Sequence, residues 1–211
     1  MKLTGERPMQ GATPDSLLAF HDAGYREVVA RLGPGTVVDV GCGAGDETLR
    51  LAAPDRFLVG VDYSSETMRA AGRTHGHVPG VRFCATDGAS LALRDASTDF
   101  VGVALISVHV TKPVAHVAEL ARVLRADGTA FVITPNAPSD FENPFHLHLV
   151  DRAALRALLE AGSYRAGLVR PSGPAQRQAE RAQRQRPRPL HCGGLAQHAL
   201  GFLQPAGDHQ C

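Results

Sequence analysis

The chain has 211 residues, of which 44% are hydrophobic, and its 22 basic and 21 acidic residues leave a formal net charge of +1. This length can bury a substantial core, and the near balance of charge excludes a global basic field that would attract nucleic acid. The four cysteines form no CxxC pair, which argues against a disulfide framework and a zinc knuckle. The sequence has no run of 18 apolar residues, which argues against a membrane span. We therefore expect a cytoplasmic protein with no nucleic-acid or membrane partner.

The first expected element is an amphipathic helix over residues 14–33, with Asp15 or Ser16 as its N-cap. Short apolar stretches then predict strands at residues 36–40, 57–62, 81–87, 99–108 and 129–135. Helical patterns follow these strands at residues 46–53, 64–73, 112–128 and 150–162. This alternation predicts an α/β fold, with a Rossmann-like, doubly wound, mainly parallel sheet that is flanked by helices.

The composition changes at Ser163. Residues 163–211 contain seven Arg but only one Glu and one Asp, and the stretch RPRP within them does not suit a helix interior or a central strand. We therefore divide the chain into an N-terminal helical cap (residues 1–35), a folded core (residues 36–162) and an Arg-, Gln- and Pro-rich tail (residues 163–211). The tail is expected to be a solvated, disordered segment, or an aberrant one that reflects an altered reading frame.

A glycine-rich turn joins the strand at residues 36–40 to the following helix. Gly41, Gly43 and Gly45 form it, and glycine allows both a tight turn and close approach of the backbone to a ligand. Asp62 ends the next strand, at the position about twenty residues on where a carboxylate commonly binds ribose hydroxyls. The combination predicts a nucleoside site, although glycines could also serve as turn formers alone.

The spacing of the turn discriminates between nucleotide ligands. A dinucleotide turn has the pattern GxGxxG, but the sixth position from Gly41 is Asp46. Asp46 and Glu47 also place negative charge where a pyrophosphate would lie. The pattern therefore disfavours an NAD(P)-dependent oxidoreductase and favours a nucleoside with a cationic or zwitterionic tail.

With these motifs in view, residues 36–162 resemble the class I S-adenosylmethionine-dependent methyltransferases. VVDVGCGAG is similar to their first motif, VGVDYS to the second and CATDGASL to the third, and ELARVLRADGTAFVITPN is similar to the helix, turn and fifth strand that follow. The opening LTGERP and the later FHDAGYREVV are similar to a bacterial subgroup that includes sugar and polysaccharide O-methyltransferases. The resemblance makes residues 36–162 the cofactor-binding core.

The resemblance implies S-adenosyl-L-methionine as the cofactor and assigns roles to several residues. Asp62 would bind the ribose, Asp87 would meet the adenine amino group, and Gly88 would make room for the adenine ring. Asp39 either contacts the amino group of the cofactor or only orders the glycine turn. Tyr63 either packs on the adenine edge or is an ordinary surface aromatic.

Two departures from the family pattern stand out. Where the family often has acidic residues after the fourth strand, this chain has Leu105 and Val108, and only His109 matches. The family sheet also ends in an antiparallel strand pair. Residues 164–169 could form its first strand, but no second member is evident, so we expect an incomplete C-terminal pair with an exposed edge.

Methyl transfer requires alignment of the reactants and, for a hydroxyl acceptor, removal of a proton. Histidine suits proton removal near neutral pH, and we name His146 first and His109 second as catalytic candidates, with His148 nearby. A loop histidine that only caps backbone groups is the alternative for His146. His21 is expected to help close the cofactor pocket. No cluster of His, Cys and acidic residues has the spacing of metal ligands, so no metal is expected.

The sequence thus predicts a methyltransferase that acts on a small molecule, by O-methylation of a sugar or secondary metabolite. Two alternatives stay open at this point: a catalytically inactive S-adenosylmethionine-binding protein, truncated or frame-altered, and an NAD(P)-dependent oxidoreductase. The sequence makes no prediction of the oligomeric state.

Overall fold

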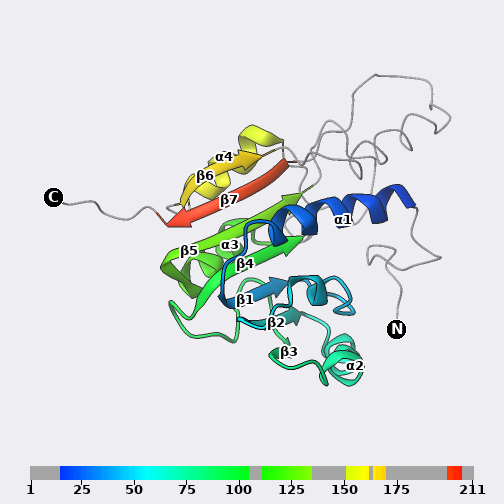
Figure 1. The fold of residues 1–211 in the computed structure, drawn as a ribbon. Helices are drawn as coiled ribbons and strands as arrows, with labels where there is room; N and C mark the ends of the chain where they lie inside the picture. Colours follow the sequence, from blue (N-terminus) through cyan, green and yellow to red (C-terminus); the bar gives the residue numbers. More distant parts are fainter. Residues whose placement is uncertain (1–14, 105–110, 135–150, 162–163, 170–198, 206–211) are drawn as a thin grey trace.

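The computed structural model describes residues 15–104, 111–134, 151–161, 164–169 and 199–205. Seven strands form one sheet in the order β3-β2-β1-β4-β5-β7-β6 (Figure 1). They are β1 (Gly35–Val40), β2 (Arg56–Asp62), β3 (Val81–Ala85), β4 (Thr98–Ala104), β5 (Leu124–Thr134), β6 (Tyr164–Val169) and β7 (Ala199–Pro205). Strands β1 to β5 pair in parallel, and β7 runs antiparallel between β5 and β6.

Helices cover both faces of this sheet. They are α1 (Asp15–Val29), the short 3-10 helix η1 (Thr48–Leu51), α2 (Ser65–His75), α3 (Pro113–Val123) and α4 (Arg152–Ala161). Successive strand residues point to opposite faces, and accordingly Phe131 and Ile133 pack with α1 and η1 while Val132 packs with α3 and α4. Figure 1 shows α1 in front of the sheet and α3 behind it. The doubly wound α/β fold is therefore confirmed.

The chain reverses its direction of winding between β1 and β4. From β1 it proceeds outward through β2 and β3, and then returns to place β4 on the other side of β1. Open parallel sheets bind ligands outside the carboxyl ends of their strands at such a switch point. Val40 pairs with both Val61 and Val103, so the ends of these three strands lie at one edge, and the glycine turn begins there.

Side chains cap the start of two helices. The Ser64 side chain accepts a hydrogen bond from the backbone of Thr67 at the start of α2. Asp151 accepts one from the backbone of Ala154 at the start of α4, over 2.8 Å. Such side-chain caps satisfy backbone N–H groups that have no partner within the helix.

Three predicted helices are shorter than expected. The N-terminal helix, predicted over residues 14–33, ends at Val29. The helix predicted at residues 46–53 is only the 3-10 helix η1, and the chain becomes extended at Ala52, two residues before Pro54, a residue that does not suit a helix interior. The helix predicted at residues 112–128 ends at Val123, since Leu124 pairs with Thr98 and starts β5. The last carbonyls of α3 instead accept hydrogen bonds from Ala96 and Ser97.

The C-terminal strand pair is complete, which corrects the expectation of a missing strand. β6 forms where it was predicted, and β7 supplies the second member, with Leu203 paired to Ala130 of β5 and to Ala166 of β6. Residues 170–198, which connect the two strands, lie outside the described residues. Among the helices of the described ranges, none has both the length and the apolar character needed to cross a membrane.

Candidate functional site

The glycine turn is fixed against the end of β2. The backbone N–H groups of Gly41 and Cys42 both donate to the carbonyl of Val61, over 2.8 and 3.0 Å. Gly41, Gly43 and Gly45 have φ angles of 81°, 55° and 90°, in the region that favours glycine. A Cβ atom on Gly45 would lie 2.6 Å from a ring carbon of Phe83. The turn therefore depends on glycine for both its backbone conformation and its space.

Asp62 ties this turn to the start of α2. Its Oδ2 atom accepts a hydrogen bond from the backbone of Gly43 over 3.2 Å, and its Oδ1 atom accepts one from the backbone of Ser64 over 2.9 Å. The side chain is 7% exposed. A carboxylate has about four lone-pair sites, so a group that orders the turn can also accept hydrogen bonds from the hydroxyls of a ligand.

Asp39 lies beneath the turn and joins three elements. Thr48 of η1 donates a hydrogen bond of 2.7 Å to its Oδ2 atom, and the hydroxyl of Tyr25 of α1 lies 3.2 Å from each carboxylate oxygen. The side chain is 1% exposed, and burial raises its pKa to about 6. Asp39 thus links β1 to α1 and η1; its contact with a ligand and its ordering of the turn stay predictions.

Helix α1 docks beside the turn through charged residues as well. Asp22 forms ion pairs with Arg26 and with Arg50 of η1, and Arg50 also pairs with Glu47. Because the end of α1 leads to the start of β1, the beginning of α1 lies toward the carboxyl edge of the sheet, where the glycine turn is (Figure 1).

His21 lies one helical turn before Tyr25 on α1 and therefore nearer to that edge. It is 7% exposed, and its Nε2 atom has no hydrogen-bond partner among the residues that the structure describes. Burial lowers its pKa to about 4, so the imidazole is neutral at pH 7. A buried polar atom without a partner is unfavourable, which makes His21 a candidate for a ligand contact.

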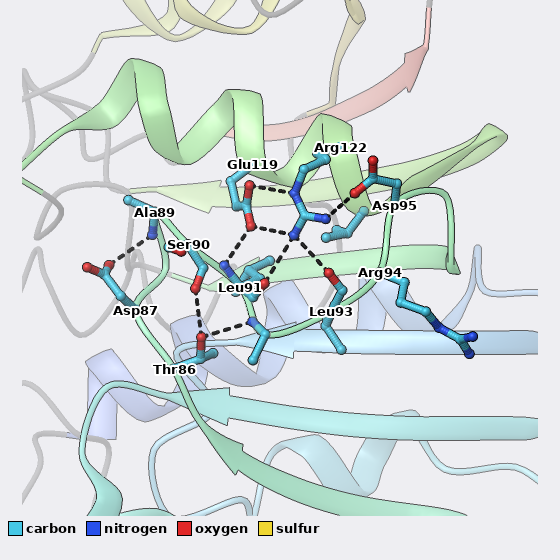
Figure 2. A network of polar contacts seen from close by, with 12 residues as sticks. Thr86, Asp87, Ala89, Ser90, Leu91, Leu93, Arg94, Asp95, Glu119 and Arg122 are labelled. Atoms are coloured by element: carbon cyan, nitrogen blue, oxygen red, sulfur yellow. Dashed lines mark hydrogen bonds and ion pairs between the residues drawn. The ribbon is translucent and has the colours of Figure 1, made fainter.

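The segment after β3 carries Asp87 and Gly88. Thr86 donates a backbone hydrogen bond to the carbonyl of Asp62 over 3.0 Å, so this segment lies beside the end of β2. The Oδ1 atom of Asp87 accepts from the backbone of Ala89 over 2.9 Å (Figure 2). The carbonyl of Gly88 lies 2.7 Å from the Nδ1 atom of His116 on α3.

The remaining predicted site residues are Tyr63 and three histidines. Tyr63 follows β2, and its side chain is 74% exposed. His109, His146 and His148 lie outside the described residues. In the part of the chain that the structure describes, no group of three or more His, Cys, Asp or Glu residues could hold a metal ion.

Several residues of the site had not been predicted. Tyr25 and Thr48 are the partners of Asp39, and His116, Glu119 and Arg122 contact the segment that follows β3. The spacing of the last three residues on one helix is a usable signal, because positions three apart share a face. For Tyr25 and Thr48 the sequence offers no comparable pattern.

Comparison with known proteins agrees with this arrangement. Residues 38–132 match the family model described as a methyltransferase domain. A protein of Mycolicibacterium smegmatis named "probable S-adenosylmethionine-dependent methyltransferase" is 30% identical over 171 residues, which cover 78% of this chain and 65% of that protein. A Mycobacterium tuberculosis protein with the same description is 31% identical over 166 residues, or 75% of this chain and 60% of that protein. The chain thus spans less than two thirds of the length of these relatives.

The crystal structure of YcgJ from Bacillus subtilis has the same fold, with a TM-score of 0.66, 19% identity and coverage of 89% of this chain and 100% of that chain. Taken together, the sheet order, the glycine turn after β1 and the carboxylate that ends β2 define a Rossmann-like methyltransferase domain. Residues 38–132 form a class I S-adenosylmethionine-dependent methyltransferase domain. The comparisons do not favour an NAD(P)-dependent oxidoreductase or an inactive binding protein.

Proposed function

We propose that the protein binds S-adenosyl-L-methionine at the glycine turn and transfers its methyl group to a small molecule that offers an oxygen acceptor, such as a sugar or a secondary metabolite. The observation that carries this proposal is the joint placement of the turn and Asp62, which are held together by the hydrogen bond from Gly43 to Asp62. The chain spans only part of its relatives, so the proposal concerns the domain described above.

The residues present fit this cofactor. Adenosine requires a close backbone approach and a ribose acceptor, which the turn and Asp62 supply. Asp87 and Gly88, in the segment beside the end of β2, are the proposed adenine side of the site. The sulfonium and ammonium groups are cationic and suit a turn that contains Asp46 and Glu47, whereas a pyrophosphate would be repelled there.

His21 provides a second, independent indication of a polar ligand. Its neutral imidazole carries a buried Nε2 atom that no described residue satisfies. An atom of this kind can accept a hydrogen bond from an ammonium group or donate one to a carboxylate, depending on its tautomer. The methionine part of the cofactor offers both groups, and we place it on the side of the turn that faces α1.

The cofactor supplies an activated methyl group, so the protein has mainly to orient the reactants and remove a proton. We propose His146 and His109 for proton removal. They belong to the segments that follow β5 and β4, and the carboxyl ends of these strands are the edge where ligands of such sheets bind. A hydroxyl acceptor is the substrate class that makes use of such a base, and the similarity of the N-terminal stretch to sugar O-methyltransferases supports the same class.

Calorimetry with the full chain tests the cofactor first. We expect S-adenosylmethionine and S-adenosylhomocysteine to bind and NAD not to bind. Binding of NAD without binding of either sulfur compound would overturn the proposal.

The acceptor is then sought in a panel of hydroxylated metabolites, scored by release of S-adenosylhomocysteine and by the new O-methyl signal of the product. Release of S-adenosylhomocysteine should disappear in the Asp62→Ala variant when the concentration of S-adenosylmethionine is limiting. Turnover that gives only N- or C-methyl products would refute the oxygen acceptor while leaving the cofactor assignment intact.

A further inference from the structure

One face of α3 holds the loop that joins β3 to β4. His116, Glu119 and Arg122 follow one another at intervals of three residues, so their side chains lie on the same face of the helix. Each of them contacts the backbone of residues 88–93. We call these three residues the α3 clamp. Figure 2 shows Glu119 and Arg122 reaching from the helix to the loop.

Arg122 makes most of the contacts of the clamp. Its Nη2 atom donates to the carbonyls of Leu91 and Leu93, over 3.0 and 2.9 Å, and its Nη1 atom pairs with Asp95. The same guanidinium binds both carboxylate oxygens of Glu119, over 2.8 and 2.6 Å. The planar fork of arginine can serve all these acceptors at once, which the point charge of lysine cannot do.

Glu119 completes the capture of Leu91. Its Oε1 atom accepts a hydrogen bond of 2.6 Å from the backbone N–H of Leu91, whose carbonyl is held by Arg122. Both backbone groups of this residue are therefore fixed by side chains of α3. The hydrogen bonds from Arg122 hold the pKa of Glu119 below its ordinary value, so the carboxylate is charged at neutral pH.

His116 fixes the other end of the loop. Its Nδ1 atom lies 2.7 Å from the carbonyl of Gly88, and because a carbonyl can only accept, Nδ1 carries the proton. Within the loop, Thr86 donates to the carbonyl of Ser90 and accepts from the backbone of Ala92, over 2.9 and 3.1 Å. The segment from Thr86 to Leu93 is thus held from within and from α3.

We propose that the α3 clamp holds this loop, before the ligand binds, in the conformation that recognises adenine. Glu119 and Arg122 are then positioning residues for base selectivity. The inference rests on the proposed function, in which Asp87 and Gly88 form the adenine side of the site. Selecting one base over another requires donors and acceptors that are already in place, because a mobile loop must be ordered at the expense of binding free energy. Asp87 lies between Thr86, which binds within the loop, and Gly88, whose carbonyl is held by His116 of the clamp.

The test compares two ligands on matched variants. Calorimetry gives the affinity of each variant for S-adenosylhomocysteine and for its inosine analogue, in which oxygen replaces the adenine amino group. The variants are Arg122→Lys, which keeps the charge but loses the fork, and Glu119→Gln, which keeps an acceptor for Leu91 but loses the charge. Arg156→Lys is the control, because Arg156 forms an i,i+4 ion pair of 3.4 Å with Glu160 at an exposed position of α4.

We expect the wild-type protein to prefer the adenine compound. Arg122→Lys should weaken its binding about tenfold, the scale of one charge-assisted hydrogen bond, and should reduce the preference severalfold. Arg156→Lys should change neither quantity. Hydrogen exchange of the amides of residues 88–93, measured without ligand, should be faster in Arg122→Lys and Glu119→Gln, which reports the loop directly.

The possible failures are distinguishable. If the wild-type protein binds neither compound, the proposed function is refuted whatever the exchange data show. If it binds S-adenosylhomocysteine and Arg122→Lys retains both affinity and preference, the clamp has no role in recognition. An equal loss of affinity for the two compounds would also overturn the inference, since it would indicate general destabilisation rather than control of base selectivity.

Discussion

The hydroxyl group of Tyr25 lies 3.2 Å from each carboxylate oxygen of Asp39. This contact joins the N-terminal helix to the strand that ends at the glycine turn, and Thr48 joins η1 to the same carboxylate. Both of these donors to Asp39, Tyr25 and Thr48, are neutral hydroxyls. Burial raises the pKa of Asp39 to about 6. When ionised, Asp39 is therefore a buried negative charge beside the proposed site of a cationic cofactor, and this leads to a prediction about pH.

The Asp39→Asn variant should differ from the wild type in how its stability depends on pH. The folded pKa of Asp39, about 6, is above its ordinary value of 3.8. The stability contributed by protonated Asp39 is therefore present below about pH 4 and is lost as the pH rises through 6. Between pH 4 and pH 7 the wild type should lose roughly 3 kcal/mol of unfolding free energy relative to Asp39→Asn. Urea unfolding of both proteins at several pH values measures this, and a constant difference would contradict it.

His21 should have the opposite effect over the same pH range. Burial lowers its pKa from 6.5 to about 4, so its contribution to stability is present above pH 6.5 and is lost as the pH falls through 4. Relative to His21→Gln, the wild type should lose roughly 3 kcal/mol of unfolding free energy between pH 7 and pH 4. The same urea series tests this prediction, and equal slopes for both proteins would show that His21 is accessible to solvent in solution.

Two glycine substitutions should change stability in opposite directions. Gly45→Ala combines a φ angle of 90° with a contact of 2.6 Å to Phe83, and the backbone strain alone should lower the unfolding free energy by roughly 1–3 kcal/mol. Gly72→Ala lies in the exposed interior of α2, where an added Cβ has no atom within 4 Å, and should raise it by about 0.5–1 kcal/mol. Thermal unfolding measures both. A stable Gly45→Ala variant with normal cofactor affinity would show that the turn relaxes easily.

Asp62→Ala should weaken binding of S-adenosylhomocysteine by roughly 1–3 kcal/mol, through loss of charge-assisted hydrogen bonds to the ribose. Calorimetry measures the change. Asp127→Ala, at an exposed position early in β5, is the matched control and should bind normally. Because Asp62 also holds Gly43 and Ser64, thermal unfolding of each variant separates a binding effect from a folding effect. An unchanged dissociation constant in a folded Asp62→Ala protein would remove the ribose role.

Much of the fold could be predicted because its signals are local. The strand that ends at Asp62 and the glycine turn before η1 were read from short patterns of apolar residues and glycine. The end of α3 could not be predicted in this way, since helix-forming residues continue past Val123. The pairing of Leu124 with Thr98 and the hydrogen bonds from Ala96 and Ser97 to the last carbonyls accompany the end of the helix. Tertiary pairing there overrides local propensity.

The parts of the site that were missed depend on contacts between distant residues. Arg122 binds the carbonyl of Leu91, 31 residues earlier in the chain, and Tyr25 binds Asp39 across 14 residues. The spacing of His116, Glu119 and Arg122 indicates a shared helix face, but no pattern in the sequence shows which distant segment that face binds. The carboxylate that ends β2 was predictable because its place after a strand is itself a sequence feature.

The position of β7 has a consequence for the order in which the molecule is assembled. During synthesis the chain emerges from its N-terminus, so β6 leaves the ribosome before β7, the strand that connects it to the sheet. Until residues 199–205 emerge, β5 presents an open edge to other nascent chains. Leu203 must then find Ala130, a partner synthesised 73 residues earlier. We therefore expect closure of this edge to be a late and slow step in the maturation of the protein.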